Sequence, residues 1–197
     1  MYKVLGGSRN RTFRVLWMLE EIGEDYQFIS LKPHSSELLK YNVGGKVPVL
    51  FDEKVPICES VAIITYLADK HNKLTHPSGT LKRAFQDSIT LNILDDIESV
   101  LWVAAKNSFV FPLNKRTPEI IENLKWEFAK NLKLFTKRMK NTPWILGDNF
   151  SLTDILLTHC LNWAEQIGFL TDETKIKNYL VKTRKRKSYL QVMKIKN

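Results

Sequence analysis

Two short segments of the sequence, eleven residues apart, carry groups suited to holding a small peptide. The first is Val47-Pro48, at the start of the strand-like run VPVLF. Proline cannot donate a hydrogen bond to a neighbouring strand, so its place here needs a special reason. A cis peptide bond would turn the backbone of Val47 outward, where an extended peptide could pair with it as an added strand. The alternative is a trans proline on an edge strand.

The second segment is Glu59-Ser60, directly before the helical run VAIITYL. The first turn of a helix has free N–H groups and a partial positive charge, so it attracts a carboxylate. Ser60 can add a hydroxyl donor, and Glu59 can receive an ammonium group. Together they suit the zwitterionic end of an amino acid, whereas ordinary N-capping is the alternative.

The first seventy residues alternate between strand and helix patterns, and these elements must position the two segments. Strands are predicted at 2–5, 26–31, 47–51 and 55–57, with helices from Phe13 to a stop at Gly23, at 37–41 and at 59–71. The resulting order is βαβαββα.

A polar stretch with Pro77 and Gly79 follows this α/β part and is typical of a linker. Beyond it, helical periodicity runs through 81–105, 118–139, 151–167 and 172–197. We therefore expect an α/β domain over 1–72, a linker over 73–79 and an all-helical domain over 80–197.

The net charge of +9 is concentrated at the end of the chain. Residues 175–197 hold nine lysines and arginines and no acidic residue, which leaves 21 bases against 21 acids elsewhere. Apolar residues such as Tyr189 and Val192 alternate with these charges, so we interpret the segment as a solvated helix face. An anionic partner is the alternative interpretation, although no base-reading motif accompanies the charges and nucleic acid is not an expected partner.

Several classes of protein and site are not supported by the sequence. Cys58 and Cys160 stand far apart in no metal or redox pattern, and the four histidines show no ligand spacing, so no metal is expected. No apolar run approaches the roughly 18 residues of a membrane span, and the first residues lack the pattern of a signal peptide. We expect a cytoplasmic protein that does not enter membranes.

Five ordered motifs give the chain a resemblance to a known family. It resembles the cytosolic glutathione S-transferases, and its first helix resembles that of bacterial members. The motifs are GKVPVL at 45–50 with ICESVAI at 57–63, RVLWMLEEIG at 14–23, His76-Pro77, the segment LGDNFSLTD at 146–154 with its capping box Ser151/Asp154, and RKSY at 186–189.

This resemblance implies a thioredoxin-like first domain, a C-terminal helical bundle and glutathione as co-substrate. The cysteinyl unit of glutathione would pair with the backbone of Val47. The γ-glutamyl end would be held by Glu59 and Ser60, and Lys46 would approach the glycyl carboxylate.

The resemblance also implies a donor to the glutathione sulfur in the loop after the first strand. That loop reads GGSRNRT over residues 6–12. A hydroxyl or amide donor and the start of the first helix can stabilise a thiolate. Ser8 is the first candidate, Asn10 and Thr12 are alternatives, and Ser8 could instead be a turn residue after two glycines.

The expected activity is conjugation of glutathione thiolate to small hydrophobic electrophiles by a homodimeric detoxification enzyme. Trp102, Phe109 and Phe111 could line an apolar pocket for the second substrate, or could be core residues. Glutathione-dependent disulfide or peroxide reduction is a rival activity. A non-catalytic interaction module similar to the stringent starvation protein is a rival of another class.

Overall fold

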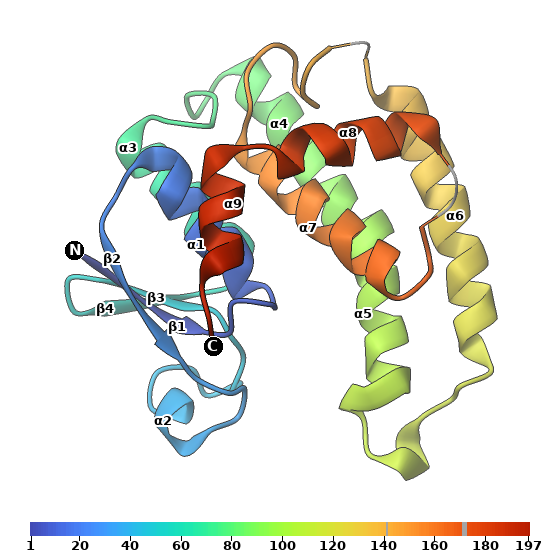
Figure 1. The fold of residues 1–197 in the computed structure, drawn as a ribbon, viewed down its shortest axis with the longest axis horizontal. Coiled ribbons are helices and arrows are strands. Elements are labelled where there is room, and N and C mark those ends of the chain that lie inside the picture. The colour runs from blue at the N-terminus through green and yellow to red at the C-terminus, as the bar shows by residue number, and fades with distance from the viewer. Residues whose placement is uncertain (141, 171–172) are drawn as a thin grey trace. The chain divides into compact units, whose positions relative to one another are not determined.

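The computed structural model describes residues 1–140, 142–170 and 173–197, which group into two compact units. Unit 1 comprises residues 1–83 together with 182–197, and unit 2 comprises residues 84–181. The four-stranded sheet with its helices and the helical second half confirm the expected fold class (Figure 1). No helix among the described residues is both long and apolar enough to cross a membrane.

Unit 1 is built on a sheet with the strand order β2-β1-β3-β4. Its elements are β1 (Tyr2–Gly6), α1 (Thr12–Ile22), β2 (Tyr26–Ser30), α2 (Ser36–Leu39), β3 (Val49–Asp52), β4 (Val55–Cys58) and α3 (Ser60–His71). Strand β2 is parallel to β1, whereas β3 is antiparallel to both β1 and β4. Strand β3 begins two residues later than predicted, after Pro48, because proline lacks the N–H that ladder pairing requires.

Both faces of this sheet are covered. Leu5 of β1 and Val49 of β3 pack with Leu38 of α2 on one face. Successive strand residues point to opposite faces, and Val4 is fully buried on the other, where α1 and α3 contact each other. Helix α1 is buried along most of its length and ends at Gly23, whose left-handed φ of 81° lets its N–H bond to the carbonyl of Leu19.

Unit 2 is a group of helices. They are most of α4 (Leu81–Asn92), the π-helical η1 (Ile93–Glu98), α5 (Ser99–Ala105), the π-helical η2 (Lys106–Val110), the 3-10 turn η3 (Leu113–Lys115), α6 (Ile120–Arg138), α7 (Leu152–Gln166) and most of α8 (Thr174–Arg184). The predicted capping box of Ser151 and Asp154 is present at the start of the buried helix α7. The predicted start of the last helical segment, Asp172, lies outside the described residues.

The last helix, α9 (Lys187–Lys194), contacts α1 of unit 1, although the sequence pattern assigns it to the helical domain. Tyr189 forms edge-to-face contacts with Phe13 and Trp17, at centroid distances of 5.3 and 5.0 Å. Val192 is fully buried. The apolar residues among the basic ones therefore form the packed side of α9, as the interpretation of a solvated helix face requires.

Candidate functional site

The register of the sheet brings three loops to one edge of unit 1. Leu5 lies opposite Val49 on β3, and Val49 lies opposite Cys58 on β4. The end of β1, the start of β3 and the end of β4 therefore coincide at this edge. The segments that follow or precede them are the loop 7–11, Val47-Pro48 and Glu59-Ser60, which are the segments singled out in the sequence.

The Val47-Pro48 peptide bond is cis, as predicted, and Pro48 is buried while Val47 is half-buried. The residues before it form a tight loop held by Asn42. Its side-chain nitrogen donates to the carbonyl of Lys46 at 2.9 Å, and its backbone carbonyl accepts from Gly45 N–H at 2.8 Å. This bonding fixes the backbone next to Val47 and leaves the Lys46 side chain exposed.

Gly45 allows this loop to approach a neighbouring turn closely. Its φ is 62°, and a Cβ at this position would lie 2.3 Å from Nδ1 of His34. The backbone N–H of His34 donates to the carbonyl of Gly45 at 2.8 Å. The sequence did not predict the roles of Asn42 and His34, because both residues bond to the loop backbone and belong to no ligand-binding motif.

The start of α3 has an unusual backbone at Glu59. Its φ of 68° and ψ of 114° lie outside the regions that side-chain-bearing residues ordinarily occupy. Backbone strain of this kind costs about 1–3 kcal/mol and is concentrated at functional sites. Within the described chain, the Glu59 side chain makes no capping bond to α3, and the residue is exposed. Ordinary N-capping by Glu59 therefore does not explain the dipeptide.

Ser60, the first residue of α3, is 4% exposed and contacts a buried arginine of α1. Nη1 of Arg14 donates to Oγ of Ser60 at 3.1 Å, and Arg14 itself is 1% exposed. Sequence analysis noted Arg14 only as part of a helix motif and missed this role. The available signal was a charged residue within the apolar run FRVLWML, where a fully buried helix surface forces the guanidinium to find a partner.

The start of α1 is organised by the side chain of Asn10. Its Oδ1 accepts from the backbone N–H of Thr12 at 2.9 Å and from the Thr12 hydroxyl at 2.7 Å. Gly6 and Gly7 make room for these side chains. A Cβ on Gly6, whose φ is 149°, would lie 2.0 Å from Oγ1 of Thr12, and one on Gly7 would lie 2.7 Å from Nδ2 of Asn10.

Ser8 is fully buried beneath the last residues of the chain. Its hydroxyl donates to the carbonyl of Ile195 at 3.2 Å, and its backbone N–H donates to Oδ1 of Asn197 at 2.6 Å. The neighbouring Arg9 donates to the sulfur and the carbonyl of Met193, both at 3.1 Å. The segment 193–197 and the loop after β1 are thus joined by four hydrogen bonds.

A buried carboxylate fixes the helix that brings this segment to the loop. Nε and Nη2 of Arg186 each donate to Glu21 of α1 at 2.6 Å, and the Ser188 hydroxyl and Nε1 of Trp17 donate to the same carboxylate. Burial alone would raise the pKa of Glu21, but the bonds from Arg186 and Ser188 outweigh it and lower the pKa. Glu21 is therefore ionised at neutral pH and anchors α9 on α1.

The cysteine nearest the site is unsuited to act as a nucleophile. Cys58 ends β4 beside Glu59, and its thiol pKa is raised, first by burial and then by the Glu59 charge. It remains a thiol at neutral pH. Among the described residues, no three side chains of His, Cys, Asp or Glu gather in a way that could hold a metal ion.

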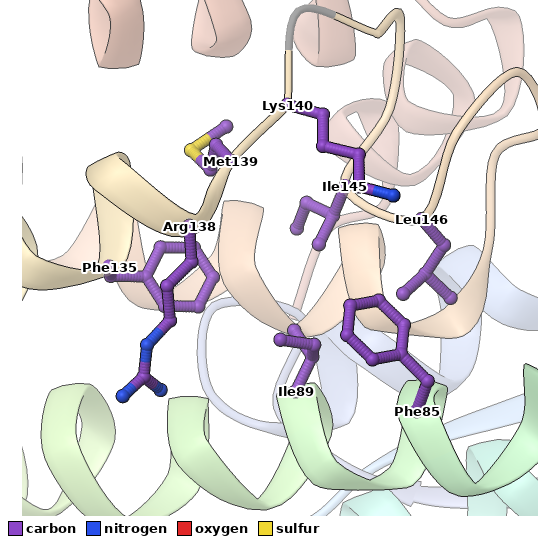
Figure 2. A pocket seen from close by; sticks show the side chains of 8 residues that line it. All are labelled: Phe85, Ile89, Phe135, Arg138, Met139, Lys140, Ile145 and Leu146. Atoms are coloured by element: carbon purple, nitrogen blue, oxygen red, sulfur yellow. The ribbon is translucent and has the colours of Figure 1, made fainter.

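A separate small cavity lies within unit 2, between α4, the end of α6 and the segment before α7 (Figure 2). Phe85, Ile89 and Phe135 contribute to its apolar lining, with Arg138 and Lys140 beside them. Its volume of about 20 Å³ suits about one water molecule and no larger ligand. Of the expected lining residues for a second substrate, Phe109 and Phe111 are 68% and 36% exposed, so they are not core residues.

Comparison with known proteins agrees with this architecture. Residues 2–69 match the family model of the glutathione S-transferase N-terminal domain, and residues 95–185 match that of the C-terminal domain. The chain is 30% identical to glutathione S-transferase 1 of Zea mays over 159 residues, covering 73% of this chain and 72% of that protein. It is 26% identical to the disulfide-bond oxidoreductase YfcG of Escherichia coli over 191 residues, covering 88% and 85%.

Among solved structures, the chain is similar to the glutathione transferase URE2P6 from Phanerochaete chrysosporium, which was solved in complex with oxidized glutathione. The TM-score is 0.84 at 22% identity, and the match covers 98% of this chain and 94% of that one. At this identity the likeness concerns the fold. The domain matches and the maize relative carry the family assignment: the chain belongs to the glutathione S-transferase family.

Proposed function

We propose that this protein is a glutathione transferase that conjugates the glutathione thiolate to small hydrophobic electrophiles. The observation that carries the proposal is the meeting of three loops at one sheet edge, through the pairs Leu5–Val49 and Val49–Cys58. A peptide lying along this edge can reach a cis-proline backbone, a helix start with an acid and a serine, and a second helix start.

In this proposal each end of glutathione has its own partner. The backbone of Val47 pairs with the cysteinyl unit, and the exposed Lys46 attracts the glycyl carboxylate. The exposed carboxylate of Glu59 receives the γ-glutamyl ammonium, while Ser60 and the N–H groups of α3 hold the carboxylate of the same unit. The strained backbone of Glu59 supports this role, because such strain is concentrated at functional sites.

For the donor to sulfur, the geometry favours Asn10 over Ser8 and Thr12. Ser8 and Thr12 are both fully buried, and their hydroxyls donate to Ile195 and to Asn10. Asn10 is half-buried at the start of α1. Because a backbone N–H can bond only to the amide oxygen of Asn10, the amide nitrogen is the group of this side chain that would donate to a thiolate.

Calorimetric titration with glutathione tests the binding part of this proposal. The parent protein should bind glutathione, and Ser60→Ala should weaken binding by about 1–3 kcal/mol through loss of a charge-assisted hydrogen bond. Ser36→Ala, at the start of α2, is a matched control that should bind as the parent does. Absence of glutathione binding by the folded parent would contradict the proposal.

The thiolate absorbance of each glutathione complex, titrated against pH, tests the donor. Asn10→Ala should raise the pKa of the bound thiol by about one to two units, since a charge-assisted bond is worth roughly 1.5–3 kcal/mol. Conjugation to an aryl chloride near neutral pH should slow accordingly. Ser8→Ala and Thr12→Ala are the controls. A larger rise in the pKa of the bound thiol in Ser8→Ala than in Asn10→Ala would identify Ser8 as the donor.

Glutathione-dependent disulfide reduction is a second candidate activity, favoured by the similarity to the disulfide-bond oxidoreductase YfcG of Escherichia coli. The same site would serve, because both reactions begin with attack by a glutathione thiolate. Turnover of a small mixed disulfide and of an aryl chloride under the same conditions separates the two activities.

A homodimer is part of the proposal. Leu81 and Phe85 of α4 lie four residues apart, so they share a helix face, and they are 90% and 50% exposed. A second copy of the chain would remove such apolar surface from water. Sedimentation equilibrium of the full chain should give twice the mass of 23.0 kDa, and a single-chain mass would contradict this part.

A further inference from the structure

The buried contact between Arg14 and Ser60 has a direction that follows from its chemistry. A guanidinium group carries only donors, whereas a serine hydroxyl has one donor and two acceptor lone pairs. In the 3.1 Å contact Ser60 must therefore be the acceptor. Its own proton then remains to be donated to another acceptor at the start of α3.

We propose that Arg14 is a positioning residue that makes the start of α3 selective for a carboxylate on the γ-glutamyl unit of the ligand. The inference rests on the proposed glutathione site and adds a residue and a specificity to it. Arg14 acts through Ser60 and through its charge.

The geometric part of the effect is orientation of the hydroxyl. A free serine hydroxyl rotates, and in one of its orientations its lone pairs would face and repel an anion. Arg14, which is 1% exposed, donates to one lone pair of the Ser60 hydroxyl from the protein interior. The Ser60 proton and the first N–H groups of α3 are thus both available to the same anionic group.

The electrostatic part is the charge beneath the helix start. A helix end carries roughly half an elementary charge, whereas a guanidinium carries a full charge at any physiological pH. Because Arg14 is buried, solvent and salt screen its field less than they screen that of a surface cation. The combined field favours a carboxylate over a neutral group of the same shape.

Two ligands that differ only in this group test the inference. One is glutathione, and the other is the glutathione analogue whose γ-glutamyl carboxylate is replaced by a carboxamide. We expect Arg14→Met to weaken glutathione binding by about 10- to 100-fold and to change binding of the carboxamide analogue by less than about threefold. Lys40→Met removes an exposed cation of the same unit and should leave both affinities as they are.

If Arg14 had a purely structural role, Arg14→Met would weaken the binding of both ligands by the same factor, and that result would overturn the inference. Arg14→Lys covers the case in which Arg14→Met does not fold. It keeps the charge, so it should retain part of the preference for glutathione over the carboxamide, and complete loss of that preference would overturn the electrostatic argument.

A double-mutant cycle with Ser60→Ala isolates the orientation effect. If Arg14 acts through Ser60, Ser60→Ala should weaken glutathione binding less in the Arg14→Met protein than in the parent. Additive losses of binding free energy would contradict the coupling. The same measurements distinguish failure of the proposed glutathione site from failure of the proposed role of Arg14. Failure of the folded parent to bind glutathione rejects the proposed site itself. Normal binding by the parent, weakened by Ser60→Ala but not by Arg14→Met, rejects only the role of Arg14.

Discussion

The starts of α1 and α3 face the same edge of the sheet, yet they are stabilised in opposite ways. The start of α1 is held by its own side chains and by residues far along the chain: Asn10 accepts a hydrogen bond from Thr12, while Ile195 and Asn197 bind Ser8. The start of α3 has a strained residue, Glu59, and a side-chain hydrogen bond between Ser60 and the buried Arg14. One helix start is reinforced by distant parts of unit 1, and the other is strained and accessible.

This difference indicates that the two helix starts have different roles in the site. A ligand end that carries charge gains most where the polar groups of the protein are exposed, as at Glu59. A thiolate gains most from a donor whose position is rigid, since a rigid donor needs no reorganisation when the charge forms. We therefore expect α9 and the following segment to influence the thiol chemistry, and Glu59 to influence the affinity for glutathione.

The largest expected effect comes from removing the anchor of α9. Glu21→Ala leaves Arg186 without its carboxylate, and loss of one partner of a largely buried ion pair costs about 3 kcal/mol. Urea unfolding should show this decrease in the free energy of unfolding. Glu37→Ala removes an exposed pair with Lys40 and should cost less than about 0.5 kcal/mol. Equal losses in both variants would contradict the anchoring role.

Glu59→Gly should separate affinity from stability at the start of α3. Glycine tolerates a φ of 68° better than a residue with a side chain, so the free energy of unfolding should rise by up to about 1 kcal/mol. Glutathione binding should weaken by about 1–3 kcal/mol because the ammonium loses its partner. Glu59→Ala should weaken binding equally without the gain in stability. A glycine variant that binds glutathione as well as the parent would remove Glu59 from the site.

Asn197→Ala should affect the α1 start without affecting glutathione affinity. The variant loses the 2.6 Å bond to Ser8 N–H, worth about 1 kcal/mol. Amide hydrogen exchange should become faster at Ser8, while calorimetric affinity for glutathione stays that of the parent. Lys196→Ala is the neighbouring control. Weaker glutathione binding in Asn197→Ala alone would show that the two helix starts are not independent.

The smallest effect concerns pH. The pKa of Glu21 is lowered in the folded protein from its ordinary value of 4.5, so its stabilising contribution is present above that value and is lost as pH falls through the lowered pKa. Below about pH 4.5 the free energy of unfolding should therefore fall more steeply in the parent than in Glu21→Gln. Identical slopes would mean that Glu21 does not couple α9 to proton binding.

The sequence was most informative where a feature depends on neighbouring residues. Pro48 after Val47, the Glu59-Ser60 pair before a helix, and the Ser151/Asp154 capping box all lie within a few residues of the structure that they specify. The strand pattern also predicted the βαβαββα order, because alternation and helical periodicity are local signals.

Contacts between distant segments could not be predicted in this way. Arg14 and Ser60 are 46 positions apart, and Ser8 and Asn197 are 189 positions apart. The burial of Ser8 follows from the second contact, so no local pattern distinguishes Ser8 from Asn10. Likewise, the attachment of α9 to α1 depends on Glu21 meeting Arg186 and Trp17 meeting Tyr189, although each residue looks ordinary in its own segment.

The discontinuous composition of unit 1 has a consequence for how the protein is made. Its sheet and α1 are synthesised before residues 84–181, and α9 is synthesised after them. At about 5–20 residues per second, residues 84–181 take roughly 5–20 s to translate. Throughout that interval the nascent chain carries Glu21, Phe13 and Trp17 without Arg186 and Tyr189. The apolar surface of α1 is therefore open to chaperones until α9 has been synthesised.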